Sequence, residues 1–288
     1  MSTSYVAYHP KQQQLLPPAL QDWLPHGHLA YFISDTVDSL NLSAFHARYA
    51  VGGCRNQPLH PAMMVKVLVY AYATGVFSSR KITRRLHEDI AFRVLAADNF
   101  PAHRTIRDFR AQHLAEFTEL FTQVVRLARE MGLVKLGTIA VDGTKVTSTD
   151  VQQLPMVLDV VQTHTGAQPA QVLADAAYRS EAVMAKLAQV YPNTELVIAL
   201  GREGKARATP KNANRYPHTV AMAAKFQTEQ TQKDYRKRKW IAEPPNGWIK
   251  NVLGFRQFSM RGLEKAQAEF KLVCMALNLR RMGAMQTG

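Results

Sequence analysis

Two short apolar runs that each end in an aspartate decide the fold: TIAVD at residues 138–142 and QVLAD at residues 171–175. A third apolar run covers residues 195–200, and helical patterns fill the intervals, at 156–163 and 180–190. Short runs that are rich in apolar and β-branched residues predict buried strands. Strands that alternate with helices are typical of a parallel sheet. The sequence therefore predicts an α/β fold for this part of the chain.

The chain before these strands is predicted to be helical, because apolar residues recur there at helical spacing. Helices are expected at residues 29–40, 61–72 and 80–97, from an N-cap at Thr105 onward, and at 114–131. After the third strand, residues 201–240 are expected to be irregular, and residues 262–282 to form an amphipathic helix. We expect an all-α domain over residues 1–135 and an α/β domain over residues 136–288.

Composition and charge narrow the choice of partner. The 288 residues are 47% hydrophobic and 20% charged, which fits two globular domains, and two cysteines exclude a disulfide scaffold. No membrane span and no secretory signal are recognised, so a soluble, cytoplasmic protein is expected. Residues 1–200 carry 18 basic and 16 acidic side chains, whereas residues 201–288 carry 18 and 6. This imbalance favours a nucleic acid as partner, and a solvated basic surface is the alternative.

Asp142 and Asp175 stand at the carboxyl ends of the first two predicted strands. A right-handed crossover of this length makes those strands neighbours, and ligands of open α/β sheets bind outside the strand ends. Adjacent carboxylates repel each other unless a cation joins them, and Mg²⁺ or Mn²⁺ suits such oxygen ligands. Two such ions can activate a nucleophile and stabilise the leaving oxygen of a phosphodiester. The alternative is that each aspartate only caps the turn after its strand.

A third carboxylate, Glu243, lies in a basic segment. Because Pro244 follows it, we expect Glu243 at the start of a helix, with Lys250 two turns along on the same face. Arg238 and Lys239 precede it. Cations that hold phosphates around a carboxylate that holds metal suit phosphoryl transfer on nucleic acid. An ordinary helix cap within a charged run is the alternative.

A positive ridge is predicted on one helix of the amino-terminal part. Four cations align there at three- and four-residue spacing: Arg80, Lys81, Arg84 and Arg85. Such a ridge fits a helix that recognises DNA or contacts its backbone. A solvated helix face is the alternative.

Two further signals are weaker. Trp240 and Trp248 flank Glu243 and could stack on unpaired bases, but burial in the core is the expected use of both. His26 and His28 have no third ligand nearby in the sequence and do not predict a zinc site.

Several short motifs occur in an order that is known from one family. The two aspartates lie in IAVDGTK (residues 139–145) and VLADAAY (residues 172–178), and Tyr235, Arg238, Glu243 and Lys250 match a Tyr–Arg–Glu–Lys signature. Further matching positions are Pro61, Ser79 to Lys81, Thr105-Ile106, Phe109-Arg110, Gly254, Phe258, Arg261-Gly262 and Asn278-Leu279. Through these motifs, nearly the whole chain resembles the bacterial insertion-sequence transposases of the DDE type, which have an RNase H-like catalytic core.

The resemblance implies a reaction and a set of roles. It implies Mg²⁺- or Mn²⁺-dependent hydrolysis at transposon ends, followed by transfer of the 3′-hydroxyl to target DNA. Asp142, Asp175 and Glu243 would hold the metal ions, Arg238 and Lys250 would bind phosphate, and Tyr235 would position the strand. The implied partner is double-stranded DNA, as terminal inverted repeats and as target, bound by a homodimer and associated with the bacterial nucleoid. An RNA-binding structural protein is disfavoured, because no aromatic RNP-like strand pattern is present.

The chain departs from the family pattern in two places. Four residues instead of three separate Arg238 from Glu243, so Lys239 is an alternative for the arginine role. An RNase H-like core normally has two more strands between the first aspartate and the next helix, and residues 143–154 are too few to hold them. We therefore expect a shortened RNase H-like parallel sheet, with the missing segment between residues 143 and 155. A catalytically impaired derivative that occupies transposon ends and inhibits transposition is the alternative function.

Overall fold

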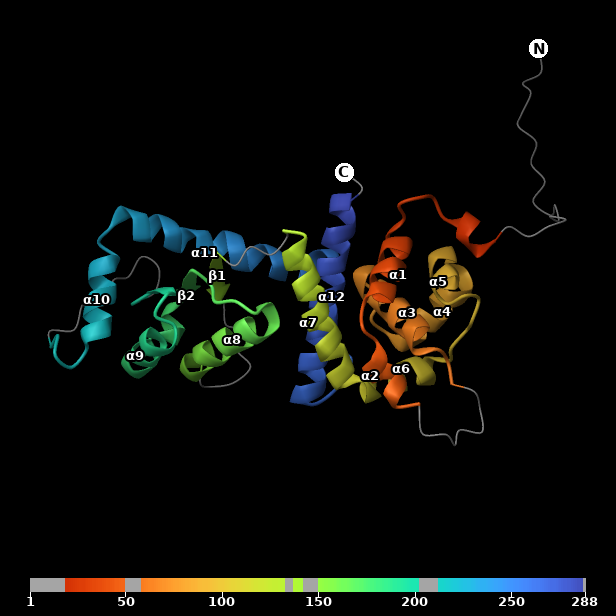
Figure 1. Cartoon of the computed structure of the whole chain (residues 1–288), viewed down its shortest axis with the longest axis horizontal. Helices are drawn as coiled ribbons and strands as arrows, with labels where there is room; N and C mark the ends of the chain where they lie inside the picture. Colours follow the sequence, from red (N-terminus) through yellow and green to blue (C-terminus); the bar gives the residue numbers. More distant parts are fainter. Residues whose placement is uncertain (1–18, 50–57, 133–136, 142–149, 202–211, 287–288) are drawn as a thin grey trace, which may run out of the picture.

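The computed structural model describes residues 19–49, 58–132, 137–141, 150–201 and 212–286. The protein is mostly helical with a small parallel sheet, which is compatible with an α/β class. Its buried hydrophobic residues form two clusters, one among helices and one around the sheet. In Figure 1 the helical part lies on the right and the sheet part on the left. No helix in the described ranges is long and apolar enough to cross a membrane.

The helical part is built from the first helices of the chain and the last one. Its elements are η1 (Leu20–Trp23), α1 (Leu29–Ser39), α2 (Ser43–Ala47), α3 (Pro61–Ala73), α4 (Ser79–Glu88), α5 (Ile90–Leu95), α6 (His103–Gln112), α7 (Leu114–Glu130) and α12 (Leu263–Gln286). The central helix α3 is apolar on nearly every side and almost completely buried. Pro61 opens it at a position where the missing N–H costs no hydrogen bond.

The last helix packs into the core formed by the first ones. Helix α12 contacts α7, α3 and α1, and its buried residues belong to the same hydrophobic cluster as theirs. The packing therefore crosses the boundary expected near Lys135. The division into domains at 1–135 and 136–288 stays a prediction.

The sheet part contains three short strands in the described residues. These are β1 (Thr138–Val141), β2 (Gln171–Ala174) and β3 (Glu195–Ile198), in the order β1-β2-β3 with both pairs parallel. The predicted neighbouring, parallel strands are therefore confirmed. The expected shortening between residues 143 and 155 falls largely on residues outside the described ranges and stays a prediction.

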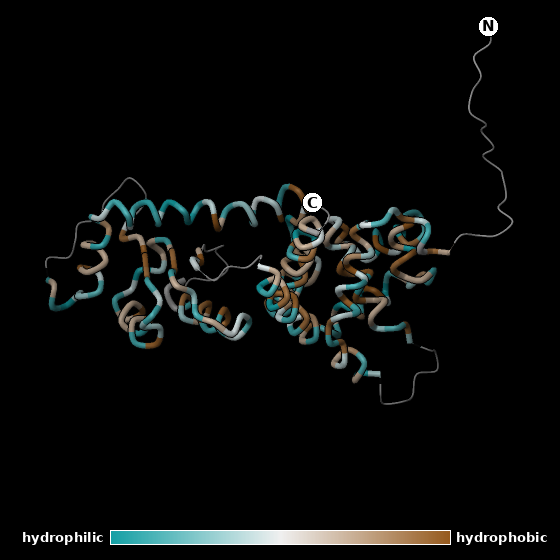
Figure 2. Tube along the Cα trace, turned by 45° about the horizontal axis from the view of Figure 1, so that its top comes forward, coloured by the Kyte–Doolittle hydropathy of each residue, from teal (hydrophilic) through white to brown (hydrophobic). Residues whose placement is uncertain are grey.

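Helices cover both faces of the sheet. Helices α8 (Asp150–Thr165) and α9 (Glu181–Val190) pack with β2 and β3 in the second hydrophobic cluster, and α10 (Pro217–Lys225) adds Met222 to it. Helix α11 (Glu229–Gly247) contacts β1 and β2. Figure 1 shows α11 as the long helix that leads from the sheet part to the helical part, and Figure 2 shows that it is mostly hydrophilic.

Three predictions of local structure are wrong. The helix expected at 80–97 breaks at Asp89, whose side chain accepts the Ala91 N–H at 2.9 Å and so starts a new helix, α5. Helix α6 begins at His103 and not after a Thr105 cap. Residues 217–225 and 229–240, expected to be irregular, are helical, because Pro217 starts α10 and i,i+4 and i,i+3 ion pairs such as Lys233–Glu229 (2.8 Å) line α11.

Candidate functional site

The carboxyl ends of β1 and β2 are in register. Val141 is paired with Ala174 in the parallel ladder. Each is the residue directly before one of the two predicted catalytic aspartates, Asp142 and Asp175. Asp142 itself lies outside the described residues. The two aspartates therefore follow, in the sequence, residues that are paired at the carboxyl edge of the sheet.

Asp175 has one carboxylate oxygen engaged in a cap. Its Oδ1 atom accepts the backbone N–H of Ala177 at 2.9 Å, which starts the short helix η2 (Ala176–Tyr178). The capping role considered as the alternative is therefore present for this residue. The Oδ2 atom has no hydrogen-bond partner in the described part of the chain, and Asp175 is partly exposed. Capping and metal binding by the two oxygens of this carboxylate are compatible.

The turn after β2 is fixed on both sides. Tyr178, the last residue of η2, is buried in the sheet cluster. Arg179 donates a hydrogen bond from Nη1 to the carbonyl oxygen of Leu200, just beyond β3, at 2.9 Å. These contacts hold the turn that carries Asp175.

Glu243 does not start a helix, so its predicted position is wrong. It lies near the end of α11, which begins at Glu229 after the N-cap Thr228. Pro244 and Pro245 lie inside the helix, which passes directly into the π-helix η3 (Trp248–Val252). A proline after an acid indicated a start because proline is favoured in the first turn, but here the helix continues through both prolines. The Glu243 side chain is exposed.

The other signature residues lie on the same continuous segment. The Arg238 guanidinium carbon lies 5.7 Å from the centre of the Tyr235 ring, and that ring packs edge-on against Phe226 at 5.5 Å. Lys250 is exposed on η3. Glu243 and Lys250 are expected on one face if the spacing between them is α-helical. The π-helical turn η3 changes that spacing, and their shared face stays a prediction.

Trp240 is not in the core, which corrects the prediction for this residue. Its side chain is 81% exposed on α11, whereas Trp248 is partly buried against the helical core with the Arg280 guanidinium 4.8 Å from its ring. Sequence reasoning missed this exposure. The signal was available, because Arg236 and Glu243 stand four residues before and three residues after Trp240, on the same polar face of a helix.

The four cations of the predicted ridge on α4 are exposed, but only two of them form ion pairs with described acidic side chains. Arg84 forms an ion pair with Glu88 at 3.0 Å, and Arg85 forms one with Asp89 at 3.8 Å. Arg80 and Lys81 are exposed, and no acidic partner contacts them within the described ranges. The first turn of α4 therefore carries the uncompensated charge of the ridge.

The described side chains do not form a complete set of metal ligands. Among them, no three His, Cys, Asp or Glu residues lie close enough together to hold a metal ion, and Asp142 falls outside them. His28 has another role, because its Nδ1 atom accepts the Ala30 N–H at 3.1 Å and caps α1.

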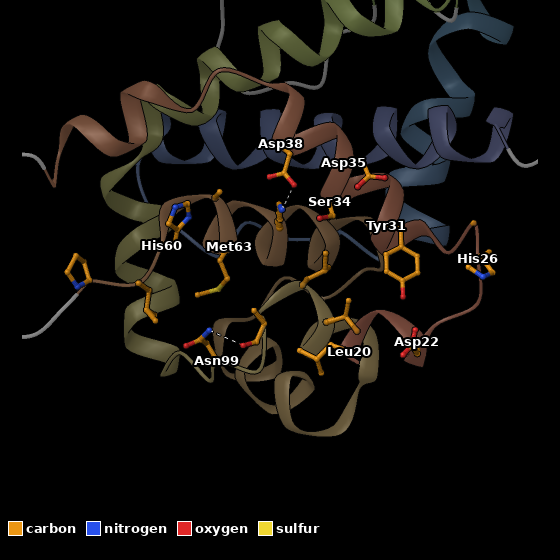
Figure 3. Close-up of a pocket in the computed structure, with 18 residues that line it drawn as sticks. Leu20, Asp22, His26, Tyr31, Ser34, Asp35, Asp38, His60, Met63 and Asn99 are labelled. Atoms are coloured by element: carbon orange, nitrogen blue, oxygen red, sulfur yellow. Dashed lines mark hydrogen bonds and ion pairs between the residues drawn. The ribbon is translucent and has the colours of Figure 1, made fainter. Parts of the chain in front are cut away.

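A broad groove of about 1280 Å³ lies in the helical part, between η1, α1, α3 and α5. Figure 3 shows Asp22, Asp35 and Asp38 among the residues around it. Asp38 is neutralised by Lys66 at 2.6 Å. None of the predicted site residues lines this groove.

Two family models match the chain. A transposase domain (DUF772) matches residues 18–112, and a transposase DDE domain matches residues 201–283. The first contains the α4 ridge and the second contains Glu243 and Lys250, while Asp142 and Asp175 lie between the two matches. No curated protein and no solved structure matches the chain. The order of the two matches agrees with the order of the motifs, and the chain belongs to the DDE transposases of insertion sequences.

Proposed function

We propose that this chain binds the double-stranded ends of its mobile element, cleaves them, and joins the freed 3′-hydroxyl to target DNA. The sheet would be the shortened core of an RNase H-like fold. The observation that carries the proposal is the pairing of Val141 with Ala174, because each of these residues directly precedes one of the two aspartates in the sequence. The DDE match over residues 201–283 supports a third acid at Glu243.

The donor set fits a hard divalent cation. Asp142, Asp175 and Glu243 offer only carboxylate oxygens, which suit Mg²⁺ or Mn²⁺. When bound, such ions would lower the charge on the phosphodiester and favour attack on it. The Oδ2 atom of Asp175 is the oxygen left for that use, since Oδ1 caps η2.

The cations around this site would hold the DNA strand. Arg238 and Lys250 would bind phosphate groups, and Tyr235, which packs against Phe226 and lies under Arg238, would fix the direction of the arginine side chain. Lys239, next to Arg238, is the alternative phosphate ligand. In the helical part, the ridge of α4 would contact the element's ends. In a homodimer, each copy would make this contact.

A second candidate is favoured by the small size of the sheet. Three strands are present in the described residues, and α8 exposes Met156 and Val160. A core that lacks part of its sheet would bind DNA through its cations but hold its acids loosely. The chain would then occupy element ends and inhibit transposition.

One experiment separates the two candidates. The purified chain is incubated with a supercoiled plasmid that carries the DNA bordering its coding sequence, with Mg²⁺, with Mn²⁺ or with EDTA. Nicks at the borders that require the metal support the transposase, and border-specific binding without nicks under either metal supports the inhibitor. If the chain neither binds nor nicks the plasmid, both candidates are wrong.

A further inference from the structure

A fully buried carboxylate joins the last helix to two of the first ones. The side chain of Glu269, on α12, has 0% of its surface exposed. It accepts a hydrogen bond from the Tyr72 hydroxyl of α3 at 2.8 Å, and Tyr72 accepts one from Arg110 Nη1 of α6 at 2.6 Å. Arg110 Nη1 also lies 3.6 Å from the carboxylate. Burying a charge costs several kcal/mol unless donors and a counter-charge surround it, so this arrangement needs a structural or functional reason.

The remaining donors to Glu269 come from the loop at residues 253–262. The backbone N–H groups of Ser259 and Met260 donate to its Oε2 atom at 2.8 and 3.3 Å. The Ser259 hydroxyl donates to Oε1. One buried side chain therefore fixes the backbone at the centre of this loop.

The start of the loop is fixed as well. Phe255 is buried and packs edge-on against Phe77, with ring centres 5.0 Å apart. Gly75 has a φ of +78°, and a Cβ atom there would lie 2.7 Å from the Leu253 carbonyl oxygen. The end of α3 and the loop thus approach so closely that only glycine fits.

The loop and the start of α12 present cations and an aromatic ring to solvent. Arg256, Arg261 and Lys265 are exposed, and Phe258 is 49% exposed. None of the three cations is in an ion pair with a described acidic side chain. By contrast, Lys233 and Lys237 of α11 are both paired. Uncompensated cations on a rigid backbone suit an anionic polymer, because little conformational entropy is lost when they bind.

We propose that residues 256–265 form a second phosphodiester-binding surface for duplex DNA, and that Glu269 is the positioning residue that holds its shape. This proposal rests on the proposed function, since it takes DNA as the partner. It adds contacts from the helical part to those of the α4 ridge and of Arg238 and Lys250. The contacts are to the DNA backbone and carry no base specificity.

The first test removes the exposed charges. R256A/R261A in the full chain is compared with K186A/K233A, which removes two charges from the exposed surface of α9 and α11. Duplex affinity is measured between low and physiological salt. R256A/R261A should bind about tenfold more weakly and reduce the log–log salt slope by about 2, whereas the control should stay close to the wild type.

The second test separates positioning from stability. E269Q keeps the shape of the side chain but removes the charge that faces Arg110 and replaces one of its two acceptor oxygens with an NH2 group, which cannot accept a hydrogen bond, so the anchor of the loop should weaken. Its salt slope should fall as in R256A/R261A, and combining the two changes should cause no further loss of affinity. L187A serves as the control for stability, because it destabilises the hydrophobic cluster around the sheet. The log–log salt slope of DNA binding by its folded fraction should stay unchanged. If E269Q does not fold, S259A takes its place in the comparison with R256A/R261A, because S259A removes one hydrogen-bond donor to the same carboxylate.

The outcomes distinguish this proposal from the proposed function. A wild-type slope near zero contradicts both. A steep wild-type slope that R256A/R261A leaves unchanged contradicts the second surface alone. Additive losses for E269Q and R256A/R261A contradict the positioning role of Glu269.

Discussion

Asp175 Oδ1 accepts the backbone N–H of Ala177 at 2.9 Å, so the carboxylate proposed to hold a metal ion also starts the turn after β2. Asparagine offers an oxygen for the same cap but lacks the charge that a metal ligand needs. D175N should therefore keep the melting temperature within a few degrees while losing Mg²⁺-dependent nicking. D175A should lose the nicking as well and about 1 kcal/mol of stability.

Duplex binding by D175N provides the control for this prediction. Removing a negative charge near phosphate should leave DNA affinity intact or raise it. If D175N abolishes binding, Asp175 is structural and the metal-ligand assignment fails. Thermal melting and gel-shift titration of the three proteins decide between these results.

The basic carboxyl-terminal part predicts a strong dependence of DNA binding on salt. Residues 201–288 carry 18 basic and 6 acidic side chains. Each phosphate contact adds about 0.9 to the magnitude of the log–log slope. A slope of several units is expected for the wild-type chain between low and physiological salt. A flat titration curve would remove nucleic acid as the partner.

The unequal pairing on α4 predicts opposite effects for two sets of substitutions. R80A/K81A removes the unpaired cations of the first turn and should weaken binding to the element's ends. E88Q removes the partner of Arg84 and should strengthen binding, because that cation is then free for phosphate. All three residues are exposed, so the folded fraction should not change. Equal affinities for the wild type and R80A/K81A would show that the ridge is only a solvated face.

The two tryptophans should respond differently to truncation. Trp240 is 81% exposed, so W240A should change stability by less than about 0.5 kcal/mol. W248A should destabilise the fold by about 2 kcal/mol, since that ring packs on the core and on Arg280. If Trp240 stacks on an unpaired base, single-stranded DNA should quench its fluorescence, and the W240F variant should lose that quenching. Quenching of the same size in W240F would exclude this contact.

Local sequence patterns predicted the strands and their parallel order, but they did not predict contacts between residues that are far apart in the sequence. The bounds of β1 and β2 followed from short apolar runs ended by an aspartate, and the parallel order followed from the helices between them. The contact between Tyr72 and Glu269 joins residues 197 positions apart, and helical periodicity shows that a face is apolar without showing what covers it. The prediction that Glu243 starts a helix was wrong for a related reason. A proline marks a helix start only if no helix is already in progress before it, and α11 begins well before Pro244. Asp142 and the segment after it lie outside the described residues, so that half of the site stays a prediction.

The proposed shortening of the core makes a prediction about aggregation. On α8, Leu154 and Leu158 face the sheet cluster, whereas Met156 and Val160, four residues apart, are 65% and 50% exposed. In a complete core, further strands beyond β1 would be expected to cover apolar surface of this kind. M156E/V160K places an i,i+4 ion pair on that face without changing the net charge. The variant should aggregate less than the wild type on concentration, at equal duplex affinity.

The control for this last prediction is an exposed valine on another helix. Val190, at the end of α9, is 49% exposed, and V190K should change aggregation little because no second apolar side chain is exposed one turn before it on that helix. Light scattering against concentration, with duplex binding measured on the same samples, compares the three proteins. If M156E/V160K scatters as much as the wild type, exposed apolar surface on α8 does not cause the association. If it loses DNA binding, that face of α8 belongs to the DNA complex, where nucleic acid covers its apolar surface.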